Sequence, residues 1–288
     1  MAYWLVTTEH LEDRLLFRDF QDFAVGMTYV ALQALKSGVF VLAFILMSNH
    51  LHFVLMCSHE RAEAFINGFK MAYSRYLRSK YGSREHLRRL KVDFKLLEGE
   101  EALEWAIAYV QMNPVAANIC VSPFDYPLGT GSTFFRVGGI IEKARCVSGM
   151  SARERLRVFH SRADVPGDWM VADAGYILPG SYVRKDMVEA IFRTPKRMQY
   201  FLNNSSKAKL RVEMEDANLP AFRDQVILAA LPDLCQSLFR RRGVQELSEN
   251  QLVELLRQLR YRFSAGANQL ARVTGLSYEQ AARYLDMA

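Results

Sequence analysis

The sequence predicts an α+β fold, with an antiparallel sheet and several helices in the first part of the chain and helices alone in the last part. Three observations lead to this prediction. Over the first 112 residues, short runs rich in aromatic and β-branched residues alternate with longer segments of helical apolar spacing. From residue 184 onward the spacing is helical to the end. Half of the 288 residues are apolar and 24% are charged, which excludes a disordered chain, a collagen and a coiled coil.

The predicted strands are short and are bounded by turn residues. Residues 3–8, Tyr-Trp-Leu-Val-Thr-Thr, combine aromatic and β-branched side chains. Two further runs are separated by Ser48 and Asn49, a pair that suits a tight connection. A fourth run, Val-Asp-Phe-Lys-Leu-Leu, alternates polar and apolar residues. The predicted strands are therefore residues 3–8, 39–47, 51–56 and 92–97.

Three helices are predicted between and after these strands. In the second helix, Phe65, Phe69 and Tyr73 recur at four-residue steps, which places them on one face. Gly82 follows this helix and suits its end, and Pro114 ends the third helix. The predicted helices are residues 19–36, 60–81 and 100–112.

The resulting order, β-α-β-β-α-β-α, predicts a four-stranded antiparallel sheet with helices on one face, close to the ferredoxin-like plan. Proline and glycine residues after position 122, and Gly138-Gly139, mark a boundary. We therefore expect one domain over residues 1–135, a linker or irregular region over 136–183, and a helical region over 184–288.

The net charge of +6 is unevenly distributed. Residues 1–134 hold 13 basic and 14 acidic groups, whereas residues 135–288 hold 24 and 17. Within the first part, residues 70–91 hold eight basic groups and one acid, Glu85. A clustered excess of positive charge favours a polyanionic partner such as DNA.

The composition gives no sign of a membrane or of secretion. The longest strongly apolar run, residues 39–47, is far shorter than the roughly 20 residues that span a bilayer. The first residues show no basic segment leading into an apolar stretch. The four widely spaced cysteines, Cys57, Cys120, Cys146 and Cys235, predict buried free thiols in a reducing cytoplasm.

Two histidines fall at the start of the third predicted strand. Since strand side chains alternate, His50 and His52 point to one face, while Leu51 points to the other. Two imidazoles on one face can share a metal ion. The alternative is a pair of hydrogen-bonded histidines at a hairpin with no ligand.

The third predicted helix carries Tyr109 and Asn113, which are four residues apart and therefore share a face. Asn113 offers a carbonyl oxygen to a hard metal such as Mg²⁺ or Mn²⁺, and Tyr109 offers a phenol that can act as a covalent nucleophile. The alternative for Tyr109 is a half-buried helix aromatic.

Two segments resemble motifs of one protein family. Residues 46–55, Leu-Met-Ser-Asn-His-Leu-His-Phe-Val-Leu, are similar to the HUH signature of the single-tyrosine transposases, in which proline usually stands at the position of Ser48. Residues 109–117, Tyr-Val-Gln-Met-Asn-Pro-Val-Ala-Ala, are similar to that family's tyrosine segment, and the two motifs lie about 60 residues apart in the family's order. The resemblance covers roughly residues 1–135 and is to the REP-associated tyrosine transposases and related insertion-sequence transposases.

The resemblance implies a DNA strand transferase. His50 and His52, with Asn113 as a third ligand, would hold Mg²⁺ or Mn²⁺, which would polarise a phosphate of single-stranded DNA. Tyr109 would attack that phosphate and form a 5′-phosphotyrosine, leaving a 3′-OH that can later rejoin the strand. The DNA partner could be a hairpin or repeat end. A homodimer could place Tyr109 against the partner's histidines.

The basic cluster is a candidate DNA surface. Tyr73, Tyr76 and Tyr81 are interleaved with its cations, and aromatic rings can stack on unpaired bases while cations contact phosphates. The alternative is a solvated helix face with core tyrosines. The predicted DNA-contacting cations are Lys70, Arg75, Arg78, Lys80, Arg84, Arg88 and Arg89.

The last residues predict a helix-turn-helix at 265–286. Ala271 is small where two helices would cross, Gly275 suits the turn, and Ser277 can cap the second helix. That second helix would present Tyr278, Gln280 and Arg283 to a major groove. An ordinary helical hairpin is the alternative.

Three functions follow from these patterns. The first is a metal-dependent single-tyrosine DNA transposase or endonuclease. The second is a domesticated, non-catalytic, sequence-specific DNA-binding protein that uses residues 265–286. The third is a metal phosphodiesterase in which water attacks and Tyr109 is structural.

Overall fold

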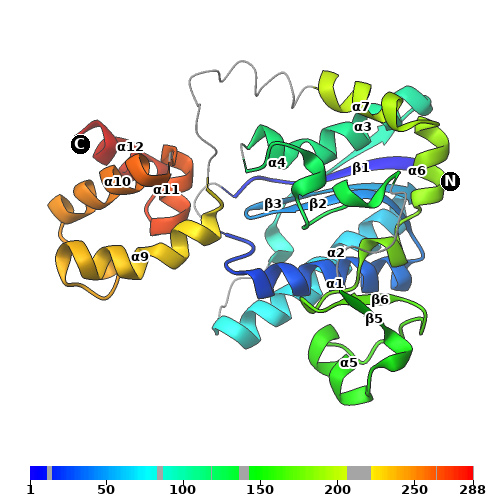
Figure 1. Ribbon diagram of the computed structural model, residues 1–288, viewed down its shortest axis with the longest axis horizontal. Helices are drawn as coiled ribbons and strands as arrows, with labels where there is room; N and C mark the ends of the chain where they lie inside the picture. Colours follow the sequence, from blue (N-terminus) through cyan, green and yellow to red (C-terminus); the bar gives the residue numbers. More distant parts are fainter. Residues whose placement is uncertain are drawn as a thin grey trace.

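A four-stranded antiparallel sheet lies at the centre of the amino-terminal part of the chain (Figure 1). It consists of β1 (Ala2–Thr8), β2 (Phe40–Met47), β3 (His50–Cys57) and β4 (Val92–Leu97), in the order β2-β3-β1-β4. All neighbouring strands are antiparallel, so the predicted strands and the ferredoxin-like order are confirmed. The computed structural model describes residues 1–11, 15–82, 87–117, 119–135, 143–205, 222–263 and 265–287, without the side chain of Arg88.

The helices cover both faces of this sheet. Phe53 packs its ring against Phe65 and Phe69 of α2 (His59–Tyr81), and α2 packs beside α1 (Phe20–Ser37). The preceding residue of β3, His52, meets Tyr109 of α3 (Gly99–Gln111) instead. Because adjacent strand residues point to opposite faces, α3 lies opposite α1 and α2. The prediction that the helices share one face is therefore wrong for α3. Strands β2 and β3 are buried almost throughout, and such strands need cover on both faces.

Helix ends are set locally by side chains that the sequence shows. The carboxylate of Asp19 accepts a hydrogen bond from the backbone N–H of Asp22 and begins α1. Helices α1 and α2 end at Gly38 (φ 63°) and Gly82 (φ 64°), in the left-handed conformation that glycine adopts without a steric penalty. Helix α3 stops at Met112 and is followed by a single turn, α4 (Asn113–Ala116).

The outer edge of β2 is covered by the segment that the sequence predicts as a boundary. The N–H groups of Leu46 and Thr130 bond to the carbonyls of Leu128 and Phe44 respectively, and this pairing leaves the edge strand protected. Between them, Gly129 lies so close to β2 that an added Cβ atom would be 2.7 Å from the Phe44 carbonyl oxygen.

We expect Gly129→Ala to lower the free energy of unfolding by about 1–3 kcal/mol, because backbone atoms would have to move to accept the methyl group. Urea unfolding measures the change. Gly149→Ala is the matched control, since a Cβ there meets nothing within 4 Å, and its expected effect is within about 0.5 kcal/mol. Equal stability of the two variants would contradict the close approach at Gly129.

Residues 143–205 pack onto the same hydrophobic core as the sheet. Val147, Phe159, Ile177 and Phe192 belong to one cluster with the residues of β2 and β3. The predicted linker thus contains ordered structure over residues 143–183, and the first core extends well past residue 135. The helices and strands of this part are β5 (Ala144–Cys146), α5 (Ala152–Phe159), β6 (Met170–Ala172), α6 (Lys185–Phe192) and α7 (Pro195–Asn204).

A second core is formed by four helices near the carboxyl terminus, α9 (Asp224–Phe239), α10 (Glu249–Phe263), α11 (Ala267–Thr274) and α12 (Tyr278–Asp286). We call residues 222–287 the helical module. Leu231, Leu255 and Leu270 lie in its centre. Figure 1 shows the helical module beside the end of the sheet that carries the β2–β3 turn. Short 3-10 helices occur at Leu87–Arg89, Pro123–Asp125, Gly131–Thr133, Val147–Gly149, Pro179–Ser181 and Val244–Glu246.

The cysteines are all free thiols, as predicted, but they are not all buried. Cys57 and Cys235 are buried, whereas Cys146 is exposed on the short strand β5. Within the described part of the chain, no helix combines the length and apolar character needed to cross a membrane.

Candidate metal centre and nucleic-acid surfaces

The histidine pair lies where β3 begins, on the face that α3 covers. His50 and His52 are 5% and 0% exposed, and their rings meet at 4.8 Å between centroids. The Nδ1 atom of His50 is 2.9 Å from Oδ1 of Asn49, and Nδ1 of His52 is 3.1 Å from Oγ1 of Thr7. Hydrogen bonds to Nδ1 fix the ring orientation, so Nε2 is the nitrogen that each ring would offer to a metal.

A third histidine, His10, joins the pair from the end of β1. Its ring stacks on His50 at a centroid distance of 3.7 Å. Strand β1 pairs with β3 with Thr7 opposite His52, and Asn49 bonds to both backbone groups of Leu11. The chain that leaves β1 therefore passes directly over the start of β3. His10 belongs to no motif that the sequence shows; the predicted strand order, which places β1 beside β3, is the signal that could have found it.

The three histidines can hold a metal ion. Their ligand atoms all lie within 4.8 Å of one another, with His10 exposed and the other two buried. Three imidazoles leave coordination positions for water or substrate, as catalytic metal sites require. The partners Asn49 and Thr7 are the kind of outer contacts that orient ligating histidines.

Tyr109 lies against this cluster within a single chain. Its ring meets the His52 ring edge-on, with centroids 5.4 Å apart and an interplanar angle of 88°. Burial raises the pKa of the Tyr109 phenol, so the phenol is protonated at neutral pH. A nucleophilic role would need a cation or a base close to the phenol oxygen.

Asn113 lies buried at the start of α4, two residues after the end of α3. Its side-chain nitrogen donates to the carbonyls of Tyr109 and Val110, at 2.9 and 3.3 Å. These bonds stabilise the helix end next to Tyr109. Metal binding by the side-chain oxygen of Asn113 stays a prediction. His10 is the third side chain that lies beside the histidine pair.

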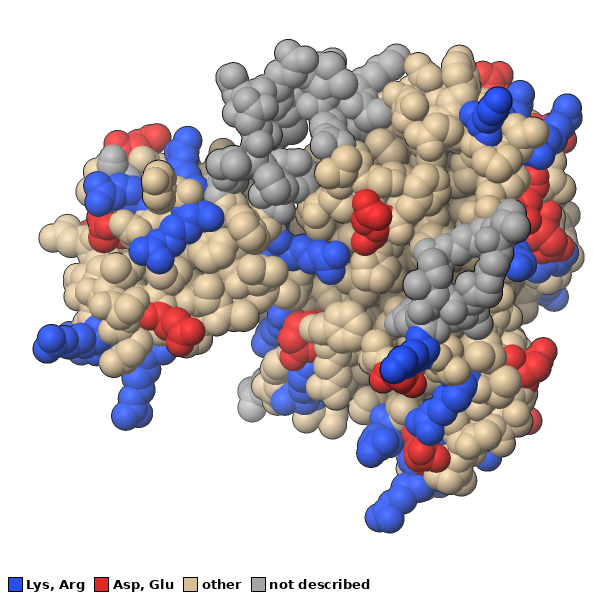
Figure 2. Space-filling view, viewed as in Figure 1, with Lys and Arg blue, Asp and Glu red and all other residues tan. Residues whose placement is uncertain are grey.

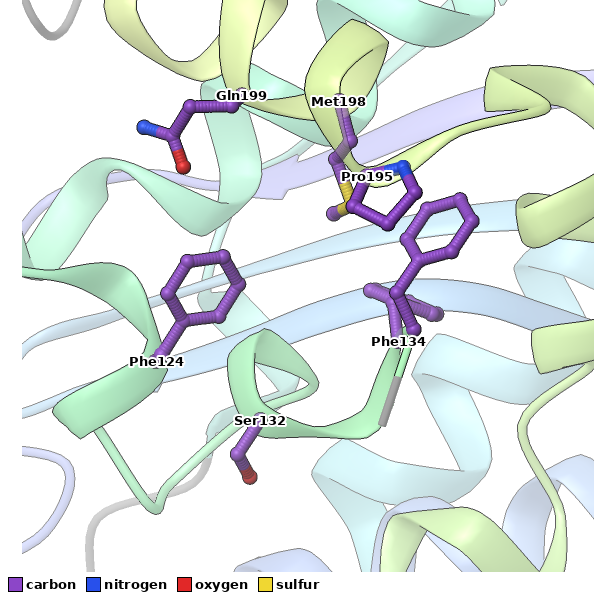
Figure 3. A pocket seen from close by; sticks show the side chains of 7 residues that line it. Phe124, Ser132, Phe134, Pro195, Met198 and Gln199 are labelled. Carbon is purple, nitrogen blue, oxygen red and sulfur yellow. The ribbon is translucent and has the colours of Figure 1, made fainter. Parts of the chain in front are cut away.

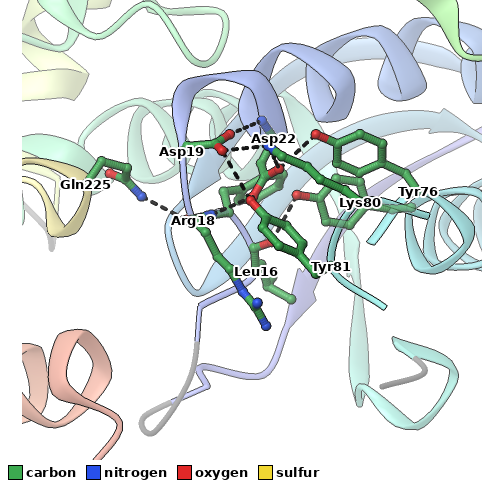
Figure 4. Close-up of polar contacts among 10 residues, drawn as sticks. Leu16, Arg18, Asp19, Asp22, Tyr76, Lys80, Tyr81 and Gln225 are labelled. Carbon is green, nitrogen blue, oxygen red and sulfur yellow. Dashed lines mark hydrogen bonds and ion pairs between the residues drawn. The ribbon is translucent and has the colours of Figure 1, made fainter. Parts of the chain in front are cut away.

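The predicted basic surface is divided by the fold. Lys70 is only 7% exposed and donates to the carbonyl of Leu90, because its position on α2 faces the core. Lys80 donates to the carboxylates of Asp19 and Asp22, at 2.6 and 2.8 Å (Figure 4). Lys70 is therefore buried, whereas Lys80 is partly exposed, with 21% of its side chain accessible, and is held by two carboxylates. Arg75, Arg78 and Arg89 are exposed, while Arg84 and the side chain of Arg88 lie outside the described residues.

The tyrosines of this cluster are structural. Tyr73 is fully buried and donates to the carbonyl of Leu16. The hydroxyls of Tyr76 and Tyr81 donate to Asp22 (Figure 4). Of the two interpretations of these tyrosines, core packing is the one that the contacts support.

Other exposed cations lie outside the 70–91 cluster. On the face shown in Figure 2, Lys and Arg side chains lie around the outer side of the helical module and around α5. Arg153, Arg157 and Arg162 are exposed on and just after α5. The ring of His160, at the end of α5, packs against Tyr76 of α2. Helix α5 thus adds positive charge beside the helix that carries Arg75 and Arg78.

The end of the helical module has the geometry of two helices joined by a tight turn. Gly275 ends α11 in the left-handed conformation, and Ser277 and Gln280 form a reciprocal capping box at the start of α12. Tyr278 is 48% exposed, and Arg283 is exposed and pairs with Glu249 of α10. Of the three residues of α12 that are predicted to contact a major groove, Gln280 uses its side chain in the helix cap.

A separate cavity of about 310 Å³ lies between the 3-10 segments after α4 and helix α7 (Figure 3). Phe124, Phe134 and Met198 supply much of its apolar wall, and Ser132 and Gln199 supply polar atoms. The histidines and Tyr109 do not line it. This cavity is therefore distinct from the candidate metal centre.

The fold and the histidine cluster together define an α+β protein with a candidate metal centre at one end of a four-stranded antiparallel sheet. No family model and no curated protein matches the chain. Among solved structures, the chain is similar to a REP-associated tyrosine transposase bound to a REP hairpin, with 13% sequence identity and a TM-score of 0.33. That similarity covers 45% of this chain and 76% of the other.

Proposed function

We propose that the protein is a transposase-like, divalent-metal-dependent DNA strand transferase that cleaves and rejoins single-stranded DNA through a 5′-phosphotyrosine at Tyr109. One observation carries this proposal: His10, His50 and His52 form a cluster, and the ring of Tyr109 lies against His52. The sequence resemblance of residues 46–55 and 109–117 to the single-tyrosine transposases supports it.

The histidines and the tyrosine have separate roles in the proposed reaction. His50 and His52, with His10 as the third side chain, would hold the ion, which when bound supplies Lewis-acid polarisation of the scissile phosphate. Of Mg²⁺ and Mn²⁺, Mn²⁺ accepts nitrogen ligands more readily, since Mg²⁺ favours oxygen. Strand β3 and helix α3 hold the two parts on separate rigid elements, which aligns the attacking oxygen with the phosphate.

The proposed covalent step needs no external energy source, because one bond to phosphorus forms as another breaks. The Tyr109 oxygen loses its proton and forms a bond to phosphorus as the bond from phosphorus to the 3′ oxygen breaks, and that oxygen leaves as a 3′-OH. The downstream strand then carries the 5′-phosphotyrosine. In rejoining, a 3′-OH attacks the same phosphorus and releases the Tyr109 phenol.

In this proposal the exposed arginines of α2 would hold the strand. The N–H groups of Leu16 and Phe17 bond to the carbonyl of Ser48, so the start of α1 lies at the β2–β3 turn. Lys80, near the end of α2, is bonded to Asp19 at the start of α1. The end of α2, with Arg75 and Arg78 near it, therefore lies at the end of the sheet that carries the histidines, where cations can contact phosphates.

The second candidate function is a non-catalytic, sequence-specific DNA-binding protein. The capped hairpin of α11 and α12, supported by α10 in a core of its own, is the observation that favours it. In this function α12 would enter a major groove with Tyr278 and Arg283. The same hairpin is compatible with the strand transferase, in which it would recognise duplex DNA beside the cleavage site.

A covalent adduct tests the proposal directly. The full-length protein is incubated with Mn²⁺ and a random pool of single strands and hairpins that carry a fluorophore at either the 3′ or the 5′ end. We expect a fluorescent protein band on a denaturing gel with the 3′ label alone, because the 5′-phosphotyrosine retains the downstream strand. Tyr109→Phe should abolish the band, whereas Tyr261→Phe, at a residue that is 85% exposed, should retain it.

Three outcomes would contradict the proposal. A band that persists in Tyr109→Phe would assign the nucleophile elsewhere. Metal-dependent cleavage with no adduct would indicate a phosphodiesterase in which water attacks. Metal-independent duplex binding without cleavage would favour the DNA-binding protein.

A further inference from the structure

A single buried carboxylate joins the helical module to the hairpin that carries the histidines. Asp224, the first residue of α9, is 3% exposed. It accepts hydrogen bonds from the hydroxyl of Ser48 at 2.6 Å, from Nε2 of Gln269 at 2.8 Å and from Nε of Arg272 at 3.2 Å. Ser48 lies in the β2–β3 turn, while Gln269 and Arg272 lie on α11. Residues 176 positions apart are thereby connected through one side chain.

The residues on both sides of Asp224 reinforce this junction. Nε2 of Gln225 donates a hydrogen bond to the carbonyl of Phe17 at 2.8 Å (Figure 4). The guanidinium of Arg223 lies 5.2 Å from the ring centroid of Tyr126, whose hydroxyl donates to the carbonyl of Leu46 in β2. The start of α9 thus contacts the loop before α1, the β2–β3 turn and the segment beside β2.

Ser48, which bonds to Asp224, lies only two residues before His50 of the candidate metal centre. Asn49 follows Ser48 directly, and its side chain both donates to the carbonyl of Leu11 and lies at hydrogen-bond distance from Nδ1 of His50. The position of the turn therefore sets the position of Asn49, which orients His50. Proline, which usually stands at position 48 in the motif that this segment resembles, has no hydroxyl to donate.

We propose that Asp224 is a positioning residue: by holding Ser48 and α11 together, it fixes the histidine-bearing turn and keeps α12 in a constant relation to Tyr109. The role of this residue in DNA strand transfer rests on the proposed function. A duplex bound by α12 would then lie at a constant distance from the strand that Tyr109 attacks. Metal affinity would then depend on the docking of the helical module.

The buried charges explain why one residue can have this effect. The side chain of Arg272 is 15% exposed and pairs with Asp224, which is almost fully buried. Removing the carboxylate charge leaves a largely buried guanidinium without its counter-ion, which weakens the packing of α9 on α11. Removing the Ser48 hydroxyl leaves the pair intact and breaks only the bond to the turn.

Ser48→Ala in the full-length protein therefore isolates the proposed connection. We expect faster amide hydrogen exchange over residues 48–52 and an affinity for Mn²⁺ that is about threefold to tenfold lower by calorimetry. This is less than the roughly 10–100-fold effect of losing a direct partner of a ligating histidine, because Ser48 acts on His50 only through Asn49. Ser48→Thr, which keeps a hydroxyl, should restore both values. Asp224→Ala, which leaves no acceptor for the Ser48 hydroxyl, should reproduce the faster exchange at 48–52 and add faster exchange in α11.

Ser181→Ala is the matched control, because the hydroxyl of Ser181 accepts a hydrogen bond from the N–H of Met170 in a different part of the fold. It should leave exchange at residues 48–52 and Mn²⁺ affinity unchanged. Unchanged exchange at residues 48–52 in both Ser48→Ala and Asp224→Ala would overturn the proposal. If the wild-type protein bound no Mn²⁺, the proposed function would fail on its own, while the exchange data would still decide the role of Asp224.

Discussion

Replacing His52 by alanine is expected to lower the affinity for Mn²⁺ by about 100-fold or more and to abolish the covalent DNA adduct. The ring is completely buried, is oriented by Thr7, and lies between His50 and Tyr109. Loss of an outer partner alone weakens metal sites by roughly 10–100-fold, so loss of a ligand should do at least as much. Calorimetry with Mn²⁺ and the adduct gel measure the two effects.

The control for this variant is His59→Ala. His59 lies at the opposite end of β3, where its ring packs on Trp4 and Phe94, so both readouts should be unchanged. His10→Ala then asks whether the third histidine is a ligand, and we expect a loss of Mn²⁺ affinity there too. Unchanged Mn²⁺ binding in His52→Ala would rule out a metal centre at this cluster.

Replacing Lys80 by alanine is expected to lower the free energy of unfolding by about 2–3 kcal/mol at neutral pH. Its ammonium group bonds to Asp22, which is fully buried, and to Asp19 (Figure 4). Breaking a buried ion pair leaves an uncompensated charge and costs about 3–5 kcal/mol, and the partial exposure of Lys80 reduces that figure. Urea unfolding measures the loss. The exposed Arg75→Ala is the control, with an expected change within about 0.5 kcal/mol.

The effect of Lys80→Ala should depend on pH in one direction. Burial raises the pKa of Asp19, but hydrogen bonds from Lys80 and from the Asp22 backbone and the charge of Lys80 together bring it below its usual value. A carboxyl whose pKa is lowered by folding stabilises the protein above the unfolded pKa of 3.8 and loses that contribution as the pH falls through the folded pKa. The difference between wild type and variant should therefore be largest above pH 4 and shrink below it. A difference that grew on acidification would contradict the ion pair.

The Lys80→Ala and Arg75→Ala variants distinguish a role in stability from a role in DNA binding. Arg75 and Lys80 lie five positions apart in one basic cluster, and the sequence predicted both as DNA contacts. The fold exposes Arg75 and places Lys80 against two carboxylates from the start of α1. We therefore expect Arg75 to affect DNA binding and Lys80 to affect stability.

Local patterns determined most of the fold. Strand and helix boundaries follow from β-branched runs, helical spacing, Gly38 and Gly82, and Pro114, because these features act over a few residues of backbone. The order of elements was sufficient to predict the antiparallel sheet. His50, His52 and Tyr109 were singled out from strand alternation, a helix position and the resemblance of two motifs.

Only the tertiary structure decided which distant groups meet. His10 joins the histidine pair because β1 pairs with β3 in a register that places Thr7 opposite His52. Lys70 is buried and Lys80 is held against two carboxylates because their side of α2 faces the core and the start of α1. Ser48 meets Asp224 because the second core docks against the β2–β3 turn. Such contacts depend on strand register and on packing between segments far apart in sequence, which short-range patterns do not encode.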